Sequence, residues 1–155
     1  MTILGIDPGT RRIGYGVIRR EGSQLRFVAA GLLTVENTNN LGAIRDAKSQ
    51  LDALIKKFKP GLIAIERLFF SKNRKTGIEV AQARGVMLLG ATEAGVPVKE
   101  YTPSQVKSIL TGYGFADKKS VLKMVRITLS EPDLDVIDDA SDALAVAISG
   151  ARNER

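Results

Sequence analysis

Residues 3–9 read ILGIDPG, an apolar run that ends in an acid and passes at once into a turn. Short apolar runs bounded by turn residues are typical of strands covered on both faces of a sheet. A second run of this kind, LIAIE at residues 62–66, ends in Glu66. Because two buried strands that end in acids converge on one edge of a sheet, we expect Asp7 and Glu66 to lie close together.

Two further acids, Asp139 and Asp142, open an apolar pattern near the end of the chain. The apolar residues of this pattern form one helical face, with the two acids about 60° apart along its border. They are Ala140, Ala143, Leu144, Ala147 and Ile148. By the same count Asp138 points roughly 160° away from the centre of that face, so we interpret it as a solvated residue at the helix start.

Clustered carboxylates repel one another unless a cation neutralises them or one of them stays protonated. A divalent metal is the simplest remedy, because hard cations such as Mg²⁺ prefer oxygen ligands and share them with substrate phosphates. The alternative is ordinary, since acids are common at strand ends and favour the dipole at a helix start. We predict a metal site whose ligands are Asp7, Glu66, Asp139 and Asp142.

The chain of 155 residues is 44% hydrophobic, which suffices for one sizeable core and predicts a single domain over residues 1–155. It contains no Cys and no His. Disulfides, thiolate nucleophiles, Cys-based zinc sites and a His base are therefore excluded. Any chemistry must depend on carboxylates, Lys, hydroxyls or a bound metal.

The net charge of +6 indicates a polyanionic partner, and we expect the basic surplus to lie on the surface away from the acidic cluster. The alternative is a basic enzyme that acts on small molecules. The chain starts directly with a strand-like run and has no apolar run long enough to span a bilayer. We therefore expect a soluble cytoplasmic protein with no membrane contact.

Hydrophobic periodicity and turn residues predict strands that first form a meander and then alternate with helices. This order indicates an α/β fold with a mixed sheet of about five strands flanked by helices. The predicted strands are 2–7, 12–19, 25–34, 62–66 and 96–101, and the predicted helices are 39–58, 76–94, 104–110, 119–129 and one from about 138.

A basic segment with two adjacent aromatics, RLFFSKNRK at residues 67–75, follows Glu66 directly. Aromatic side chains in a basic loop can stack on an unpaired base while cations hold phosphates. We predict that Phe69 is exposed and that Phe70 completes the apolar face of the strand; the alternative is that either packs under the loop. The candidate cations are Lys72, Arg74 and Lys75.

Lys107 and Lys118 flank a Gly-rich turn at Gly112 and Gly114, which would let the backbone pass close to a phosphate chain. Each lysine could stabilise charge on a reacting phosphate. The alternative for each is a solvated charge on a helix. The helix over 76–94 is more apolar than one buried stripe requires, which indicates either a dimer interface or ordinary core burial.

Six segments, in order along nearly the whole chain, together resemble the RuvC family of Holliday junction resolvases. Any one of them is weak evidence, but the ordered set is specific. They are GIDPG at 5–9, GYGVI at 14–18, AIE at 64–66, QARGV at 82–86, QVK at 105–107 and DASDALAVAI at 139–148.

The resemblance implies a ribonuclease H-like fold, a homodimer and a Mg²⁺- or Mn²⁺-dependent endonuclease that nicks two opposed strands of a four-way DNA junction. The branch-migration proteins RuvA and RuvB become the expected partners. Some family members carry a His in the last acidic cluster, whereas this chain has none, and Asp138 is the alternative to Asp139 as ligand. The implied metal ligands are Asp7, Glu66, Asp139 and Asp142, and Phe69, Lys107 and Lys118 would serve DNA binding or catalysis.

The available chemistry suggests a mechanism for such an enzyme. Two metals roughly 4 Å apart can activate a water and stabilise the leaving 3′ oxygen without a His base. The expected products carry 5′-phosphate and 3′-hydroxyl ends. A two-fold dimer would present two sites to a two-fold junction, which explains paired cuts.

Three competing interpretations belong to other classes. A shorter resolvase-like family acts on RNA, but the chain length and the segments QARGV and DASDAL disfavour it. A non-catalytic junction-binding module would gain nothing from a negative cluster in a basic face. An actin-like phosphotransferase would need a second phosphate-binding glycine loop, and the sequence shows none.

Overall fold

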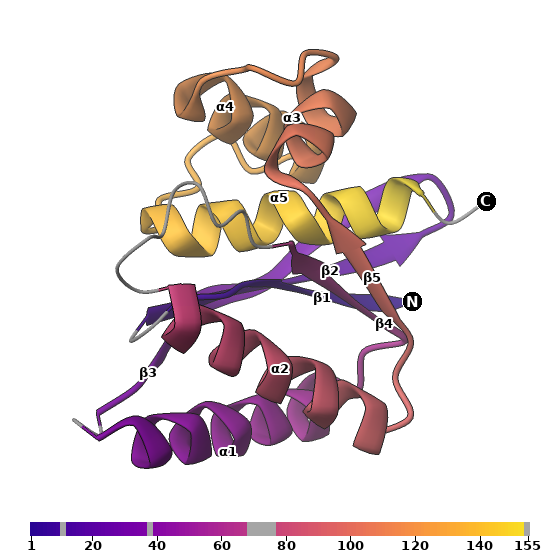
Figure 1. Ribbon diagram of the computed structural model, residues 1–155. Coiled ribbons are helices and arrows are strands. Elements are labelled where there is room, and N and C mark those ends of the chain that lie inside the picture. The colour runs from indigo at the N-terminus through magenta and orange to yellow at the C-terminus, as the bar shows by residue number, and fades with distance from the viewer. Residues whose placement is uncertain (10–11, 37–38, 68–76, 154–155) are drawn as a thin grey trace.

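The computed structural model describes residues 1–9, 12–36, 39–67 and 77–153 (Figure 1). The predicted order of elements is confirmed, and most ends agree within two residues. The strands are β1 (Thr2–Asp7), β2 (Arg12–Glu21), β3 (Gln24–Thr34), β4 (Leu62–Glu66) and β5 (Val98–Tyr101). The helices are α1 (Asn40–Phe58), α2 (Gly77–Glu93), α3 (Pro103–Thr111), α4 (Lys118–Leu129) and α5 (Asp138–Arg152).

The five strands form one mixed sheet, as the sequence predicted, and the structure gives their order as β3-β2-β1-β4-β5. The first three strands make an antiparallel meander, whereas β4 runs parallel to β1 and β5 runs parallel to β4. The carboxyl ends of β1, β4 and β5 therefore meet at one edge of the sheet.

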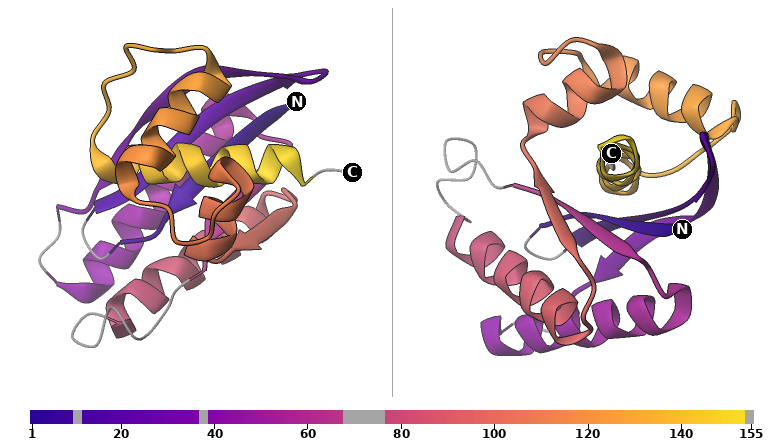
Figure 2. Two further views of the ribbon diagram at one scale, coloured as in Figure 1. Left: turned by 90° about the horizontal axis from the view of Figure 1, so that it is seen from above. Right: turned by 90° about the vertical axis from the view of Figure 1, so that its right-hand side faces the viewer.

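Helices cover both faces of the sheet and create two cores. Residues alternate between the faces along each strand, so Ile3 packs toward α5 while Leu4 and Ile6 pack toward α1 and α2. Figure 2 shows α5 end-on, enclosed between the sheet and the layer made by α3 and α4. This position explains why almost every residue from Ala140 to Ala151 is buried.

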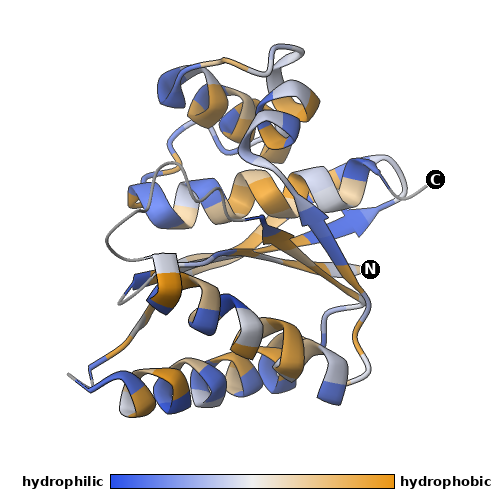
Figure 3. Ribbon diagram, viewed as in Figure 1, coloured by the Kyte–Doolittle hydropathy of each residue, from blue (hydrophilic) through white to orange (hydrophobic). Residues whose placement is uncertain are grey.

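Figure 3 shows that the start of α5 is hydrophilic whereas its middle is strongly apolar. The buried part of α5 is rich in small side chains, which allow a helix to approach a sheet closely. In the part of the chain that the structure describes, no helix combines the length and the apolar character needed to cross a membrane.

Small residues on the sheet bring α5 unusually close to it. A Cβ at Gly14 of β2 would overlap the backbone oxygen of Asp139, and a Cβ at Gly5 of β1 would lie 2.6 Å from the backbone nitrogen of Ala147. No side chain larger than hydrogen fits at either point without a backbone shift. The two glycines therefore determine how near the acids of α5 come to the end of β1.

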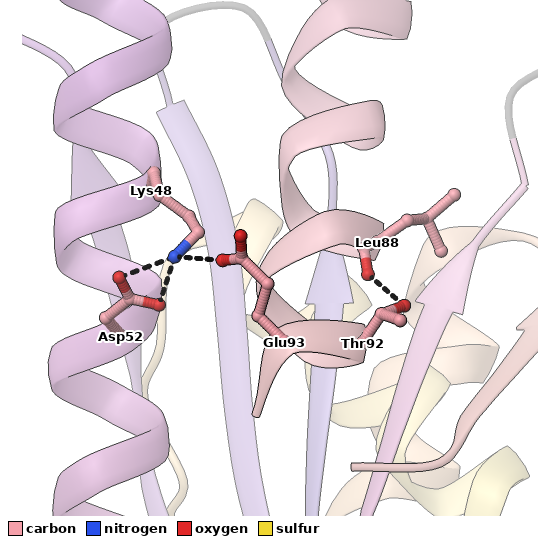
Figure 4. Close-up of polar contacts among 5 residues, drawn as sticks. All are labelled: Lys48, Asp52, Leu88, Thr92 and Glu93. Atoms are coloured by element: carbon pink, nitrogen blue, oxygen red, sulfur yellow. Dashed lines mark hydrogen bonds and ion pairs between the residues drawn. The ribbon is translucent and has the colours of Figure 1, made fainter. Parts of the chain in front are cut away.

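The helices of the opposite face are held to each other by polar contacts as well as by their core (Figure 4). Lys48 of α1 contacts a carboxylate oxygen of Asp52 at 2.7 Å and one of Glu93 on α2 at 3.0 Å. In the last turn of α2 the Thr92 hydroxyl donates to the carbonyl oxygen of Leu88 at 2.8 Å. Exposed contacts of this kind add little stability individually, so apolar packing dominates in this layer.

Candidate active site

Asp7 and Glu66 end neighbouring parallel strands and face the same side of the sheet. Ile6 pairs with Ile65, so the next residue of each strand comes to the same edge. Side chains alternate along a strand, and Ile3 and Leu62, each four residues earlier, belong to the core on the α5 side. The two carboxylates therefore project toward the start of α5.

The first two turns of α5 add Asp139 and Asp142 to this edge. Burial and, in decreasing order of effect, the negative charges of Glu66, Asp142 and Asp139 together raise the pKa of Asp7 to about 8, against a lowering by Lys118. The structure thus brings all four predicted acids into one electrostatic cluster. Their roles are taken up under the proposed function.

Asp138 and Asp139 occupy different environments although they are adjacent. The side chain of Asp138 is 83% exposed, whereas that of Asp139 is 35% exposed. The prediction that Asp138 is a solvated residue at the helix start is confirmed. The backbone of Asp139 lies against Gly14, which holds it at the sheet.

Two basic side chains lie directly on the acidic cluster. Lys118 at the start of α4 places its Nζ 3.4 Å from a carboxylate oxygen of Asp142 and 3.6 Å from one of Asp138. Arg12 at the start of β2 places its Nε 3.4 Å from a carboxylate oxygen of Asp139. The expectation that the basic surplus lies away from the acids is therefore wrong for these two residues, because the fold brings two element starts to the same edge.

The ion pair between Lys118 and Asp142 affects the pKa of each partner. The pKa of Lys118 is raised, chiefly by the charge of Asp142. The pKa of Asp142 is also raised, because its burial outweighs the opposing effect of Lys118, and Asp138 and Asp139 add to the rise. Lys118 therefore neutralises only part of the negative charge of the cluster.

Lys107 lies near the start of α4, on the same side of the sheet as Lys118. The pKa of Asp117, the N-cap of α4, is lowered chiefly by its hydrogen bonds to Ser120 and slightly by the charge of Lys107. Pro103 occupies the first turn of α3, and Thr102 and Gln105 form a capping box there. These contacts stabilise the N-terminus of α3, the helix that carries Lys107.

The predicted base-stacking segment falls outside the described residues; this applies to Phe69, Phe70, Lys72, Arg74 and Lys75. The structure does describe Arg67, whose backbone N–H donates to the carbonyl oxygen of Tyr101 at 2.7 Å. The guanidinium of Arg67 lies 3.5 Å from Glu100, which also pairs with Arg84 of α2. Glu100 therefore holds an arginine directly beside Glu66.

Sequence reasoning missed Arg12, Glu100 and Arg84 as neighbours of the site. Arg84 lies in the segment QARGV, which contributes to the family resemblance but does not by itself indicate a contact with Glu100. Arg12 and Glu100 carry no local signal, because Arg12 reaches Asp139 and Glu100 reaches Arg67 only when distant elements pack together. An ion pair between residues far apart in sequence becomes visible only when the sheet order is known.

The donor set fits a hard divalent cation by its chemistry and its charge. All candidate ligands are carboxylates, and the raised pKa of Asp7 shows that the cluster favours added positive charge. Within the described residues, however, no three acids are gathered closely enough to hold an ion as they stand. Two of the four carboxylates, those of Asp139 and Asp142, are paired with Arg12 and Lys118 in this structure.

A solved structure defines the class of this fold. Thermus thermophilus RuvC matches with a TM-score of 0.90 and 32% identity, over 97% of this chain and 93% of that chain. The same protein solved in complex with a Holliday junction substrate matches equally well, with a TM-score of 0.90. The fold is accordingly the ribonuclease H-like fold of the Holliday junction resolvases, as the sequence predicted.

Sequence comparisons then give the family. The profile described as Crossover junction endodeoxyribonuclease RuvC matches residues 3–150. The relative of that name from Heliobacterium modesticaldum is 45% identical over 154 residues, 99% of this chain and 95% of its own length. That from Rubrobacter xylanophilus is 47% identical over 154 residues, 99% of this chain and 86% of its own length. The chain belongs to the RuvC family of crossover junction endodeoxyribonucleases.

Proposed function

We propose that this protein resolves four-way DNA junctions in recombination and repair by paired symmetric nicks that leave 5′-phosphate and 3′-hydroxyl ends. The observation that carries the proposal is the convergence of Asp7, Glu66, Asp139 and Asp142 at one edge of the sheet, in a chain of the RuvC family. A basic protein with an acidic centre suits a phosphodiester substrate, because cations on the protein bind the DNA while the acids serve the reacting phosphate.

Asp7, Glu66, Asp139 and Asp142 would hold Mg²⁺ at this edge, two ions in each site, with Mn²⁺ as a substitute. When bound, the cations would supply the positive charge that activates a water and stabilises the leaving oxygen. Asp139 is preferred to Asp138 because its charge acts on Asp7 and its side chain is the less exposed of the two.

The chain's own residues have distinct tasks in this scheme. Gly5 and Gly14 let α5 approach, so that the acids on α5 reach Asp7. Lys118, paired with Asp142 in this structure, would contact the scissile phosphate once DNA occupies the site and stabilise its developing charge. Lys107, close to the start of α4, would bind a neighbouring phosphate.

The segment after Glu66 would bind the junction itself. We propose that Phe69 stacks on an unpaired base, and that phosphates are held by Lys72, Arg74 and Lys75. Support comes from the first residue of the segment, since Arg67 donates its backbone N–H to Tyr101 and pairs through its side chain with Glu100. The root of the segment is thereby fixed beside Glu66.

A homodimer would place two such sites on one junction. Support comes from exposed apolar side chains on the α1 and α2 layer, where Leu41 is 81%, Ile78 74% and Leu89 54% exposed. Apolar surface of this kind is typical of sites that contact another protein. RuvA and RuvB are the further partners we propose, on the basis of the family resemblance.

We further propose that residues 1–155 act as a single nuclease domain in the cytoplasm. The two cores share one sheet, so α1 and α2 on one face and α5 on the other depend on the same strands. Junction DNA in a bacterial cell is a cytoplasmic substrate, which supports the proposed location.

The test is nicking of a labelled synthetic four-way junction, compared with linear duplex and an RNA–DNA hybrid, in Mg²⁺, in Mn²⁺ and in EDTA. We expect paired, metal-dependent nicks confined to the junction by the wild type and none by Asp7→Asn. Tight junction binding without cutting would instead support a binding module. Cutting of the hybrid alone would move the protein to the class of RNA-directed nucleases.

A further inference from the structure

Tyr113 and Phe115 form an exposed aromatic pair in the turn between α3 and α4. Tyr113 is 62% exposed and Phe115 is 82% exposed. Their ring centroids lie 5.8 Å apart with the rings tilted by 56°, a favourable geometry for an aromatic pair. Two large aromatic faces turned to solvent indicate a binding surface.

The turn that carries this pair is held by internal hydrogen bonds. The Thr111 hydroxyl donates to the carbonyl oxygen of Lys107 at 2.8 Å and accepts from the backbone N–H of Tyr113 at 3.1 Å. Gly112 ends α3 in the left-handed region, with φ of 79°, and the N–H of Ala116 donates to the carbonyl oxygen of Tyr113 at 3.1 Å. A preformed turn loses little entropy when a ligand binds.

The pair lies next to the proposed DNA-binding lysines. Lys118 follows Phe115 by three residues, a span of at most about 11 Å, and its Nζ lies 3.4 Å from Asp142. Lys107 lies at the α3 end of the turn, where its carbonyl oxygen accepts from the Thr111 hydroxyl, and its charge still acts on Asp117 at the α4 end. The turn itself stands on the α5 side of the sheet (Figures 1 and 2). A strand held by these lysines would therefore pass within reach of the two rings.

Exposed rings beside cations are the combination with which proteins hold unpaired nucleotides, because bases stack on the rings while phosphates meet the charges. We propose that Tyr113 and Phe115 stack on a nucleobase of the junction that loses a stacking neighbour at the crossover, close to the strand being cut. This inference rests on the proposed function. A protein partner is the less favoured occupant because the pair lies between the two lysines, on the side of the proposed active site.

The test compares junction binding by fluorescence anisotropy with single-turnover nicking of the same junction in Mg²⁺. We expect Phe115→Ala, Tyr113→Ala and the double variant to bind the junction about 5- to 50-fold more weakly than the wild type, as loss of stacking on one base implies. Binding to linear duplex should be unchanged.

Two substitutions at one position separate stacking from general apolar contact. Phe115→Leu keeps an apolar side chain but removes the ring face, so it should behave like Phe115→Ala. Phe115→Trp keeps a larger ring face and should restore wild-type binding. The slope of junction affinity against salt should stay the same in all of them, because no charge is removed.

The matched control is Ile127→Ala, which removes an apolar side chain that is 59% exposed in the last turn of α4. It should leave both readouts unchanged. Wild-type junction affinity and nicking in the Ala variants, or a change confined to their oligomeric state in sedimentation, would overturn the inference. If the wild type nicked no junction, the proposed function would fail, and the anisotropy series would show separately whether the rings bind DNA.

Discussion

The two ends of α5 are stabilised in opposite ways. At the C-terminal end of α5 the Arg152 guanidinium donates to the carbonyl oxygen of Ile109 at 2.8 Å and to the Thr128 hydroxyl at 3.2 Å. Arg20 of β2 donates to the carbonyl oxygen of Ala151 at 3.1 Å. At the start of α5 Ile137 offers no side-chain cap, and the acids there face Asp7. The C-terminal end of α5 is therefore held by hydrogen bonds from arginine side chains, whereas the N-terminal end brings several negative charges together.

This difference suggests that the C-terminal end of α5 contributes stability, whereas the N-terminal end is suited to the ligand that we propose. Basic residues at a helix end favour the dipole and satisfy carbonyl groups. Acids at a helix start also favour the dipole, yet a buried carboxyl beside three others costs free energy in the absence of a cation. The acids at the start of α5 therefore lower stability in the absence of a cation, as expected for the metal site that we propose there.

The largest expected effect is on the reaction at the start of α5. Asp142→Asn keeps the size of the side chain but removes its charge, so junction nicking should fall by at least about 10²-fold. Stability should change little. Rates come from single-turnover nicking, with Asp138→Asn as the matched control, and equal losses in the two variants would contradict the difference drawn between these acids.

The next largest effect is expected on stability, from a substitution that disturbs the close approach of α5 to the sheet. Gly14→Ala forces a Cβ onto the backbone oxygen of Asp139, and we expect a loss of about 2–4 kcal/mol in the free energy of unfolding. Urea denaturation measures it. Gly85→Ala on α2, where an added Cβ meets nothing within 4 Å, should instead stabilise the protein by about 0.5–1 kcal/mol.

Removing the charge of Asp7, which ends β1 and faces the start of α5, should stabilise the metal-free protein. Asp7 has a pKa raised from 3.8 to about 8 in the fold, so its stabilising contribution is complete below about pH 4 and is lost as the pH rises to about 8. In EDTA at pH 7, Asp7→Asn should be more stable than the wild type by roughly 1–3 kcal/mol.

Thermal unfolding at several pH values checks this prediction. The advantage of Asp7→Asn should shrink toward pH 4, because the wild-type carboxyl is then protonated in both states. Addition of Mg²⁺ should stabilise the wild type more than the variant. A wild type more stable than the variant at pH 7 in EDTA would contradict the description of this end of α5.

A substitution at the C-terminal end of α5 should lower stability and leave nicking unchanged. Arg152→Ala removes two hydrogen bonds from a charged donor and should lower the free energy of unfolding by about 1–2 kcal/mol. Nicking at saturating enzyme should remain at the wild-type rate. A large loss of nicking in a folded variant would show that the two ends of α5 are not separable.

The smallest effect is expected far from α5, in the contact between α1 and α2 (Figure 4). Lys48→Ala removes the ion pairs with Asp52 and Glu93, which are partly exposed. We expect only a small loss of stability, and it should decrease further in high salt because exposed ion pairs are screened. Chemical denaturation at low and high ionic strength measures it, and a salt-independent loss would point to packing of the Lys48 stem.

Several features of the site followed from local patterns in the sequence. An apolar run with an acid at its end predicts a buried strand with a carboxylate at the sheet edge, which gave the positions of Asp7 and Glu66. Helical periodicity separated Asp139 and Asp142 from Asp138. These signals are local, because strand alternation and helical spacing depend on neighbours in the chain.

Other features could not be predicted because they depend on packing between distant elements. Gly14 lies in a strand, where glycine has no local advantage, and its role depends on the helix across from it. The contact of Lys118 with Asp142 joins two helix starts, and total charge led to the wrong expectation that basic residues avoid the acids. Charge composition carries no information about such pairs.

Calorimetric titration with Mn²⁺ would show whether the four carboxylates from β1, β4 and α5 form one cation site, as we propose. We expect binding by the wild type and by Asp138→Asn. Binding should be strongly weakened in Asp7→Asn, Glu66→Gln, Asp139→Asn and Asp142→Asn. Wild-type binding in Asp139→Asn or Asp7→Asn, or loss of binding in Asp138→Asn, would contradict the proposal.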